Sequence, residues 1–282
     1  MLVMLAWIFH PPVRKPQNLY LLSMAVADFA IGVILAPTLM QELRSDDWPF
    51  STGWCQAYLF IIGTLTSVSF IHVAAIALDR YHIVFDTTTY MQRHTFSYFL
   101  QRIAFIWILS MWIGLPDVVE MPETENFLSL TGQCVTPLKN GYRIFLALGN
   151  YLLPTIIILK TYRDIYQKLK DVDIQFNSDK KQEASMIKEN DDEVIPLKRQ
   201  RRALHMLAII ILAACVSWLP FTVVYAVLGY TDWSGKLLTM RTCLAIGFSN
   251  SAMNPVIYAR CNPDFRTGFK KVITLGGRIR CL

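Results

Sequence analysis

Residues 55–81 read CQAYLFIIGTLTSVSFIHVAAIALDRY, an apolar stretch with a cysteine at its start and a charged pair at its end. Cys55 lies 25 residues before Arg80. As an α-helix, that separation is a rise of roughly 37 Å, about one crossing of a bilayer. Charged side chains are costly to hold at a membrane and therefore mark functional positions. The stretch predicts a membrane helix with a cysteine at one surface and the Asp79–Arg80 pair at the other.

The composition of the whole chain also indicates a membrane protein. Of its 282 residues, 54% are hydrophobic and only 17% are charged, and the mean hydropathy is +0.36. Because a lipid-exposed backbone must satisfy its hydrogen bonds within each segment, we predict an all-α, polytopic membrane helical bundle. The apolar segments of spanning length lie near 17–41, 55–78, 99–116, 142–162, 203–230 and 237–259.

The distribution of basic residues predicts the orientation. If the segments after Asp79 and after Tyr162 are cytoplasmic, few of the 27 Lys and Arg residues lie on the opposite side. Cytoplasmic loops carry the excess of Lys and Arg in membrane proteins, so the net charge of +6 is a topology signal. Nucleic acid is therefore not an expected partner. The basic residues on the opposite side are Arg44, Lys139, Arg143, Lys236 and Arg241.

The six cysteines fall into three groups. Cys55 and Cys134 lie in extracellular positions, where a disulfide persists. A second group, inside apolar helices or at their ends, is expected to be reduced and packed: Cys215, Cys243 and Cys261. Cys281, next to Arg278 and Arg280, is either a palmitoylation site or a plain thiol. No pair has the CxxC spacing of a metal site, so no metal is expected.

We treat the chain as a single domain, 1–282, with three segments outside the complete spans. Residues 1–9 are apolar but too short to cross a bilayer. They are interpreted as the stub of a first helix, so that the sequence looks like a fragment. Residues 168–202 are rich in Lys, Asp, Glu and Gln and predict a mobile third cytoplasmic loop. Residues 262–274 predict an amphipathic cytoplasmic helix. Its apolar side is expected to hold Phe265, Phe269, Val272 and Ile273.

With these landmarks placed, the chain resembles the rhodopsin-like (class A) G protein-coupled receptors over nearly its whole length, with an incomplete first helix. The family's motifs occur in order, each on a different segment, as LSMAVAD (22–28), DRY (79–81), CVSWLP (215–220) and NPVIY (254–258). Trp107 with Pro116 and Pro154 with Tyr162 mark two further helices. The resemblance implies a seven-transmembrane receptor fold.

The resemblance also implies an activation switch. Arg80, held by Asp79, would be released to meet a heterotrimeric G protein. Pro220 removes a backbone hydrogen bond and kinks its helix, which makes it a pivot for an outward swing of the cytoplasmic end. The residues assigned to the switch are Asp79, Arg80, Tyr81, Tyr162, Trp218, Pro220, Asn254, Pro255 and Tyr258.

Asp28 lies near the middle of its segment, where an ionised acid needs partners. In the resembled family the matching acid binds a sodium ion, and oxygen ligands suit such a hard cation. The implied site comprises Asp28, Ser69, Asn250 and Ser251. The alternative is a neutral Asp28 that is hydrogen-bonded to Asn254.

The resemblance is greatest to receptors for biogenic amines, but the expected ligand pocket is apolar and aromatic. An amine pocket needs a carboxylate seven residues after the conserved cysteine, and that position is Ile62. The retinal-binding lysine of an opsin would fall at Phe248, which cannot form a Schiff base. We therefore expect a neutral or weakly polar ligand, or a peptide. The pocket residues are Ile62, Thr66, Trp218, Phe221, Tyr225 and Phe248.

Other classes of function fit less well. A transporter would show internal repeats, and an intramembrane protease would need a second deep acid beside Asp28. We therefore expect no enzyme and no required cofactor. The expected function is a multi-pass plasma-membrane receptor that binds an extracellular ligand, contacts membrane lipids and activates a heterotrimeric G protein. The remaining alternative is a truncated, non-signalling receptor remnant.

Overall fold

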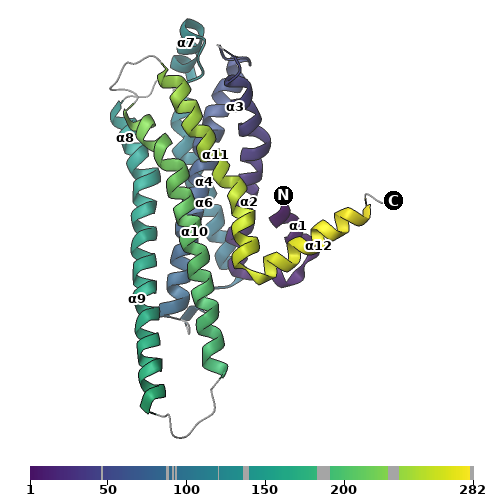
Figure 1. Ribbon diagram of the computed structural model, residues 1–282. Coiled ribbons are helices and arrows are strands. Elements are labelled where there is room, and N and C mark those ends of the chain that lie inside the picture. The colour runs from purple at the N-terminus through teal and green to yellow at the C-terminus, as the bar shows by residue number, and fades with distance from the viewer. Residues whose placement is uncertain are drawn as a thin grey trace.

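The computed structural model describes residues 1–45, 47–86, 89–90, 92, 94–119, 121–135, 140–182, 191–227 and 235–279. Helices make up this part of the chain, with no strand in it (Figure 1). The long helical segments are α2 (Leu19–Ala30) with η3 (Ile31–Leu35) and α3 (Ala36–Glu42), α4 (Thr52–Phe85), α6 (Phe96–Val119), α8 (Asn140–Ala147) with η4 (Leu148–Leu152) and α9 (Leu153–Gln182), α10 (Asp191–Val227) and α11 (Lys236–Cys261). The short elements are α1 (Leu2–Phe9), η1 (Pro11–Val13), η2 (Pro16–Asn18), α7 (Met121–Thr131) and α12 (Pro263–Ile279).

All six predicted apolar segments are helical over their described residues, and the predicted all-α bundle is confirmed. Five described stretches are long and apolar enough to cross a membrane: Pro16–Glu42, Thr52–Phe85, Phe96–Pro116, Ile144–Val172 and Ala208–Val227. The sixth segment, α11, has 26 residues but is more polar. Its polar side chains include Asn250 and Asn254, which are buried inside the bundle. The lower hydropathy of α11 therefore reflects an interior polar face.

Two of the long segments contain a π-helical turn just before a proline. The π turn η3 precedes Pro37, and η4 precedes Pro154. Proline has no N–H, and its ring clashes with the carbonyl four residues earlier. For Pro154 that carbonyl belongs to Asn150. A wider π turn relieves the clash, and such turns are frequent at functional sites.

The helix α4 occupies the centre of the bundle and contacts α2, α6, α9 and α10. One buried cluster surrounds its cytoplasmic half, and a second surrounds its outer half and the disulfide. Large apolar side chains also cover the outside. On α6, Phe105 is 64% exposed, Ile108 63% and Trp112 72%. An apolar exterior of this kind suits a lipid solvent.

The helix α12 runs beside α1, away from the axis of the bundle (Figure 1). Phe265 and Phe269 are buried, and Lys15 forms an ion pair with Asp264. The helix predicted over 262–274 is thus present. Ile273, rotated about 80° from Phe265 on a helix with 3.6 residues per turn, lies on the same half of the helix but is 63% exposed.

The segment 168–202 differs from its prediction. The helix α9 continues to Gln182 and α10 begins at Asp191. Both extend beyond the other helices at one end of the bundle (Figure 1). The prediction of a loop was therefore wrong at 168–182 and 191–202, while 183–190 lie outside the described residues. Residues 155–195 contain neither Gly nor Pro, and Lys, Gln and Glu are good helix formers, so the helices continue past the apolar segments.

Candidate functional site

A disulfide fixes the outer end of the bundle. As predicted, Cys55, near the start of α4, forms a disulfide with Cys134. Their Cα atoms lie 5.7 Å apart. The backbone N–H of Trp48 donates to the carbonyl of Gly132 at 2.7 Å. Gly132 has φ +69°, and a Cβ there would lie 2.1 Å from Oδ1 of Asp47. Glycine alone fits this close approach, which holds the Cys134 segment against the segment before α4.

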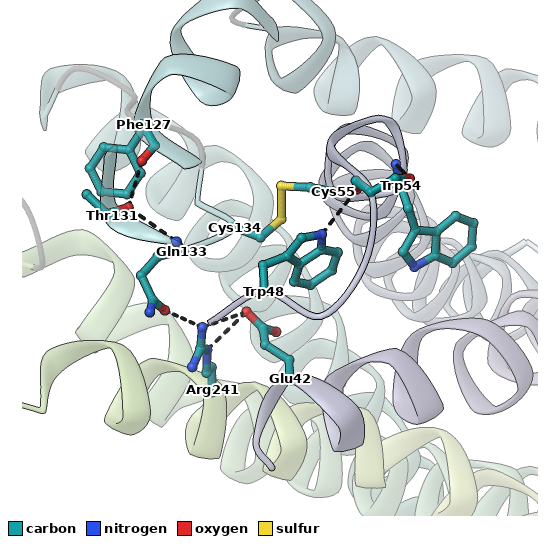
Figure 2. Close-up of a disulfide and its surroundings, with 10 residues drawn as sticks. Glu42, Trp48, Trp54, Cys55, Phe127, Thr131, Gln133, Cys134 and Arg241 are labelled. Atoms are coloured by element: carbon teal, nitrogen blue, oxygen red, sulfur yellow. Dashed lines mark hydrogen bonds and ion pairs between the residues drawn. A yellow bond between two sulfur atoms is a disulfide. The ribbon is translucent and has the colours of Figure 1, made fainter. Parts of the chain in front are cut away.

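A buried ion pair lies beside the disulfide and joins α3 to α11 (Figure 2). Nη2 of Arg241 lies 3.0 Å from Oε1 of Glu42, and the two residues are 8% and 3% exposed. Oε1 of Gln133, next to Cys134, also accepts from Nη2 of Arg241. We call Glu42, Gln133 and Arg241 the extracellular clamp. The clamp connects three segments around the outer end of the bundle.

Below the disulfide, a cavity of about 150 Å³ opens between α4, η4, α10 and α11. Five of the six predicted pocket residues line it: Ile62, Thr66, Trp218, Phe221 and Tyr225. Among the described lining residues there is no Asp, Glu, Lys, Arg or His. The sequence reasoning missed Asn150 and Tyr151, because it did not predict the π turn that places both on the cavity wall.

Phe248 is not on the wall of this cavity, and the prediction was wrong for it. It lines a larger apolar hollow of about 690 Å³ between α2, η3, α3 and α11. It also meets Trp218 edge-on, at 6.2 Å between ring centroids. A Cβ at Gly247 would lie 2.8 Å from the Trp218 ring. Glycine therefore lets α11 approach this tryptophan closely enough for Phe248 to pack behind it.

Aromatic rings connect the cavity to the kink of α10. Tyr151 meets Phe70 at 5.4 Å between ring centroids, and Phe70 meets Trp218 at 5.7 Å. The Tyr151 hydroxyl donates to the carbonyl of Cys215 at 3.1 Å. Edge-to-face contacts of this kind stabilise one relative orientation of the rings. A ligand that moves Trp218 would therefore also act on Pro220, two residues along the same helix.

Asp28 lies at the base of the larger hollow, with Ser251 also on its wall. Nδ2 of Asn254 donates to Oδ2 of Asp28 at 2.8 Å. Three other oxygens of the predicted sodium site are buried and have no hydrogen-bond partner among the described residues. They are Oδ1 of Asp28, Oγ of Ser69 and Oδ1 of Asn250. Buried acceptors left without a donor fit a hard cation, which oxygen ligands prefer.

At the inner end of α4, Asp79 is 5% exposed and holds two partners. Nη2 of Arg80 lies 3.8 Å from its Oδ2, and the Tyr90 hydroxyl donates to its Oδ1 at 2.9 Å. Burial, and then the nearby Asp79 carboxylate, raise the pKa of Tyr90, so this tyrosine stays protonated and donates. The sequence reasoning missed Tyr90. The sequence feature that could have identified it is the presence of a tyrosine in the short connection after the charged pair.

The other predicted switch residues lie at several levels of the bundle. Tyr81 stacks on Phe85, with 4.3 Å between ring centroids. Tyr162 packs against the buried cluster of the cytoplasmic half and against the smaller buried pair Ile165 and Leu169. Tyr258 is 1% exposed and packs on Phe265. Pro255 lies inside α11. In this arrangement the ion-pair partner of Arg80 among the described residues is Asp79.

Cys281 lies outside the described residues. The other three cysteines are not disulfide-bonded: Cys243 is buried, and Cys215 and Cys261 are partly buried, as expected for packing residues.

Comparisons with known proteins give one consistent family. Residues 1–258 match the family model described as 7 transmembrane receptor (rhodopsin family). The chain is 28% identical to trace amine-associated receptor 7a of Mus musculus, with 97% of this chain and 77% of that protein covered. It is 24% identical to the alpha-2A adrenergic receptor of Danio rerio, with 96% of this chain and 87% of that protein covered. It is 27% identical to octopamine receptor beta-1R of Drosophila melanogaster, with 97% of this chain and 58% of that protein covered.

The family match extends over the bundle, the disulfide and the charged pair described above. Receptors of this family are multi-pass plasma-membrane proteins rather than enzymes. The chain belongs to the rhodopsin family of seven-transmembrane receptors, the class A G protein-coupled receptors.

Proposed function

We propose that this receptor binds an extracellular ligand in the 150 Å³ cavity and activates a heterotrimeric G protein. The observation that carries the proposal is the continuity of α4. Ile62 lines the cavity and Arg80 lies at the cytoplasmic end of the same unbroken helix. Arg80 lies 18 positions after Ile62, a rise of roughly 27 Å along an α-helix. Ligand binding would shift the equilibrium toward a state in which Arg80 is exposed, provided that the ligand binds this state more tightly.

The experiment is GDP–GTP exchange on a purified G protein by the full chain in lipid nanodiscs. Arg80→Ala is expected to abolish exchange without changing ligand binding. Arg102→Ala is the matched control, because the Arg102 guanidinium lies over the Tyr98 ring, 4.7 Å from its centroid, away from the charged pair. Undiminished exchange by Arg80→Ala would refute the role of this residue. A folded chain without exchange for any tested G protein would favour the non-signalling alternative.

The relatives are named for trace amines, adrenergic ligands and octopamine. An ammonium ligand would need a carboxylate partner, because a buried and unpaired charge is strongly unfavourable. Ile62 supplies none, and no described lining residue of the cavity is acidic. Glu42 is buried nearby but is paired with Arg241. We therefore propose that the ligand differs in charge from those that the relatives' names indicate.

We also propose that a sodium ion binds at Asp28. The unpartnered oxygens of Asp28, Ser69 and Asn250 support this site, with Ser251 beside them. A bound cation would balance the negative charge of the Asp28 carboxylate, so this buried carboxyl group would not have to be protonated. By binding the folded state, the cation would stabilise the packing of α2, α4 and α11, which carry these residues.

Membrane lipids are the third proposed partner. The outward faces of α6 and α10 are covered with exposed apolar side chains, such as Trp112 and Leu212, which is 65% exposed. In water this surface would favour aggregation, whereas acyl chains solvate it. The chain should therefore remain folded only in a bilayer or a detergent.

A further inference from the structure

An aromatic cluster lies beside Asp79 at the inner end of α4, and His94 belongs to it. The His94 ring stacks on Tyr90, with 3.8 Å between ring centroids and 21° between the ring planes. It also meets Tyr98 edge-on at 4.4 Å, and the Phe99 ring lies at 5.9 Å. Tyr90 is the residue whose hydroxyl donates to Asp79. The His94 imidazole is therefore separated from the Asp79 carboxylate by a single ring.

A hydrogen bond determines which ring nitrogen of His94 can take up a proton. Nδ1 lies 2.9 Å from the carbonyl oxygen of Tyr90. A carbonyl oxygen only accepts, so Nδ1 carries the hydrogen of the neutral ring and Nε2 carries the lone pair. Histidine is the side chain that changes its charge between about pH 5 and 8. Because His94 is only partly buried, its ring is open to protons from the cytoplasm.

The titratable and charged groups near His94 come from α2, α4, α6 and the connection between α4 and α6. The His82 ring lies 6.2 Å from that of His94 and is exposed. Asp86 is exposed and accepts from the backbone N–H of Thr89. Asp79 is buried, and a positive charge on His82 or His94 attracts its carboxylate. The carboxylate on which a proton at His94 acts is therefore Asp79. The whole set comprises Tyr20, Asp79, Arg80, His82, Asp86, Tyr90, Tyr98 and Arg102.

A proton on His94 would strengthen the contact between Tyr90 and Asp79 in several ways. The cation would be attracted to the face of the Tyr90 ring. It would also draw electron density from that ring and make the hydroxyl a stronger donor, because neighbouring groups polarise one another in a low-dielectric interior. Its charge would attract the Asp79 carboxylate directly. Each effect stabilises the arrangement in which ionised Asp79 keeps Arg80 paired.

We propose that His94 is a positioning residue for the charged pair and makes the switch sensitive to cytoplasmic pH. The protonated ring holds Tyr90 on Asp79 and so keeps Arg80 paired, whereas the neutral ring releases part of this constraint. Lowering the pH should therefore reduce basal GDP–GTP exchange. Protonation of Asp79 itself would have the opposite effect, so the sign of the pH dependence identifies the group. The inference rests on the proposed function for this readout alone.

The first test measures basal exchange by the full chain in lipid nanodiscs between about pH 6 and 8. At each pH the rate of the wild type is divided by that of His94→Phe, so that the pH dependence of the G protein cancels. His94→Phe retains a ring beside Tyr90 that cannot be charged. The ratio should fall about two- to fivefold on acidification, which is the effect of one cation–ring contact at a partly exposed site.

Two further variants separate charge from packing. His94→Arg carries a planar cation throughout this range, because a guanidinium stays protonated. Its exchange should be as low as that of the acidified wild type and should not follow the pH. His82→Phe is the matched control, because it removes the neighbouring imidazole, which meets Tyr81 rather than Tyr90. This variant should retain the fall of exchange on acidification.

The second test needs no G protein and follows the Tyr90 hydroxyl itself. Tyrosine that is isotopically labelled at the ζ carbon gives an NMR signal for Tyr90, which is assigned by its loss in Tyr90→Phe. In the wild type the signal should move between about pH 6 and 8. The movement should be lost in His94→Phe. It should be reduced in Asp79→Asn, because a hydrogen bond to a neutral acceptor is weaker than one to a carboxylate.

Several results would overturn the inference. A ratio that is constant or that rises on acidification would do so, as would high exchange by His94→Arg or loss of the pH dependence in His82→Phe. A Tyr90 signal that does not move with pH would also do so. If the Tyr90 signal moves as expected but no form of the chain supports exchange, the proposed signalling function is refuted, while the positioning role of His94 at Tyr90 and Asp79 is supported.

Discussion

The extracellular clamp should dominate the response of the outer end of the bundle to mutation. Arg241→Leu would leave the Glu42 carboxylate without its cation, and Glu42→Leu would leave the guanidinium without its anion. Their side chains are 9% and 4% exposed, so solvent cannot replace the lost partner. Removing one partner of a buried ion pair costs about 3–5 kcal/mol, whereas replacing both with apolar side chains is often neutral. We expect each single variant to be strongly destabilised and the double variant to be close to wild type.

Thermal unfolding in lipid nanodiscs measures the effect. Intrinsic tryptophan fluorescence follows the unfolding, with Trp48 in the buried cluster around the disulfide as one of the chain's seven tryptophans. For a chain of this size, 1 kcal/mol corresponds to a Tm change of about 2 °C or more. The Tm of each single variant should therefore be lower than that of the wild type by at least about 6 °C. Arg44→Leu is the control, because it removes an exposed arginine near the same end of the bundle.

The comparison among the variants tests whether the ion pair between Glu42 and Arg241 holds α3 to α11. If Arg241→Leu behaves like Arg44→Leu, the ion pair does not hold α3 to α11. If the double variant loses as much stability as the sum of the two single variants, the loss comes from packing rather than from an unpaired charge. Either result would refute the reasoning.

Three further predictions concern the interior of the bundle. Tyr90→Phe removes the hydrogen bond to Asp79 and should raise basal GDP–GTP exchange, because the pair loses a contact worth about 1–2 kcal/mol; an unchanged basal rate contradicts this. Sodium chloride in place of choline chloride should raise Tm, because sodium at ten times its dissociation constant would stabilise the folded state by about 1.4 kcal/mol, and Asp28→Asn should show no such increase. Gly247→Ala should destabilise the chain by about 1–3 kcal/mol through overpacking against Trp218, measured by the same unfolding assay, whereas Gly53→Ala, with open space around it, should not.

Local patterns in the sequence were sufficient to predict the helical bundle and its disulfide. Apolar segments of spanning length have one stable arrangement in lipid, and a cysteine one helix length from a charged pair identifies the two ends of α4. The segment 168–202 shows the limit of this reasoning. Its charge composition indicated a loop, but the segment contains no Gly and a single Pro, Pro196, and α9 continues to Gln182 while α10 begins at Asp191.

Contacts between distant segments could not be predicted in the same way. Glu42 and Arg241 are 199 residues apart, and neither has a local pattern that identifies its partner. Tyr90 reaches Asp79 only because the connection after α4 folds back. Phe248 was placed in the pocket by its position in a motif, but the close approach at Gly247 put it behind Trp218. Each difference depends on how helices pack rather than on where they begin and end.

The pattern of identity to relatives also explains why the ligand class must be argued from the cavity wall. An identity of 28% over 97% of the chain is sufficient to fix the bundle, because the framework residues that pack helices together determine the fold. Among the described residues of the cavity wall there is no acid, and Ile62 stands where an amine pocket needs a carboxylate. The family match therefore identifies the class of receptor, whereas the side chains on the cavity wall are the basis for proposing the class of its ligand.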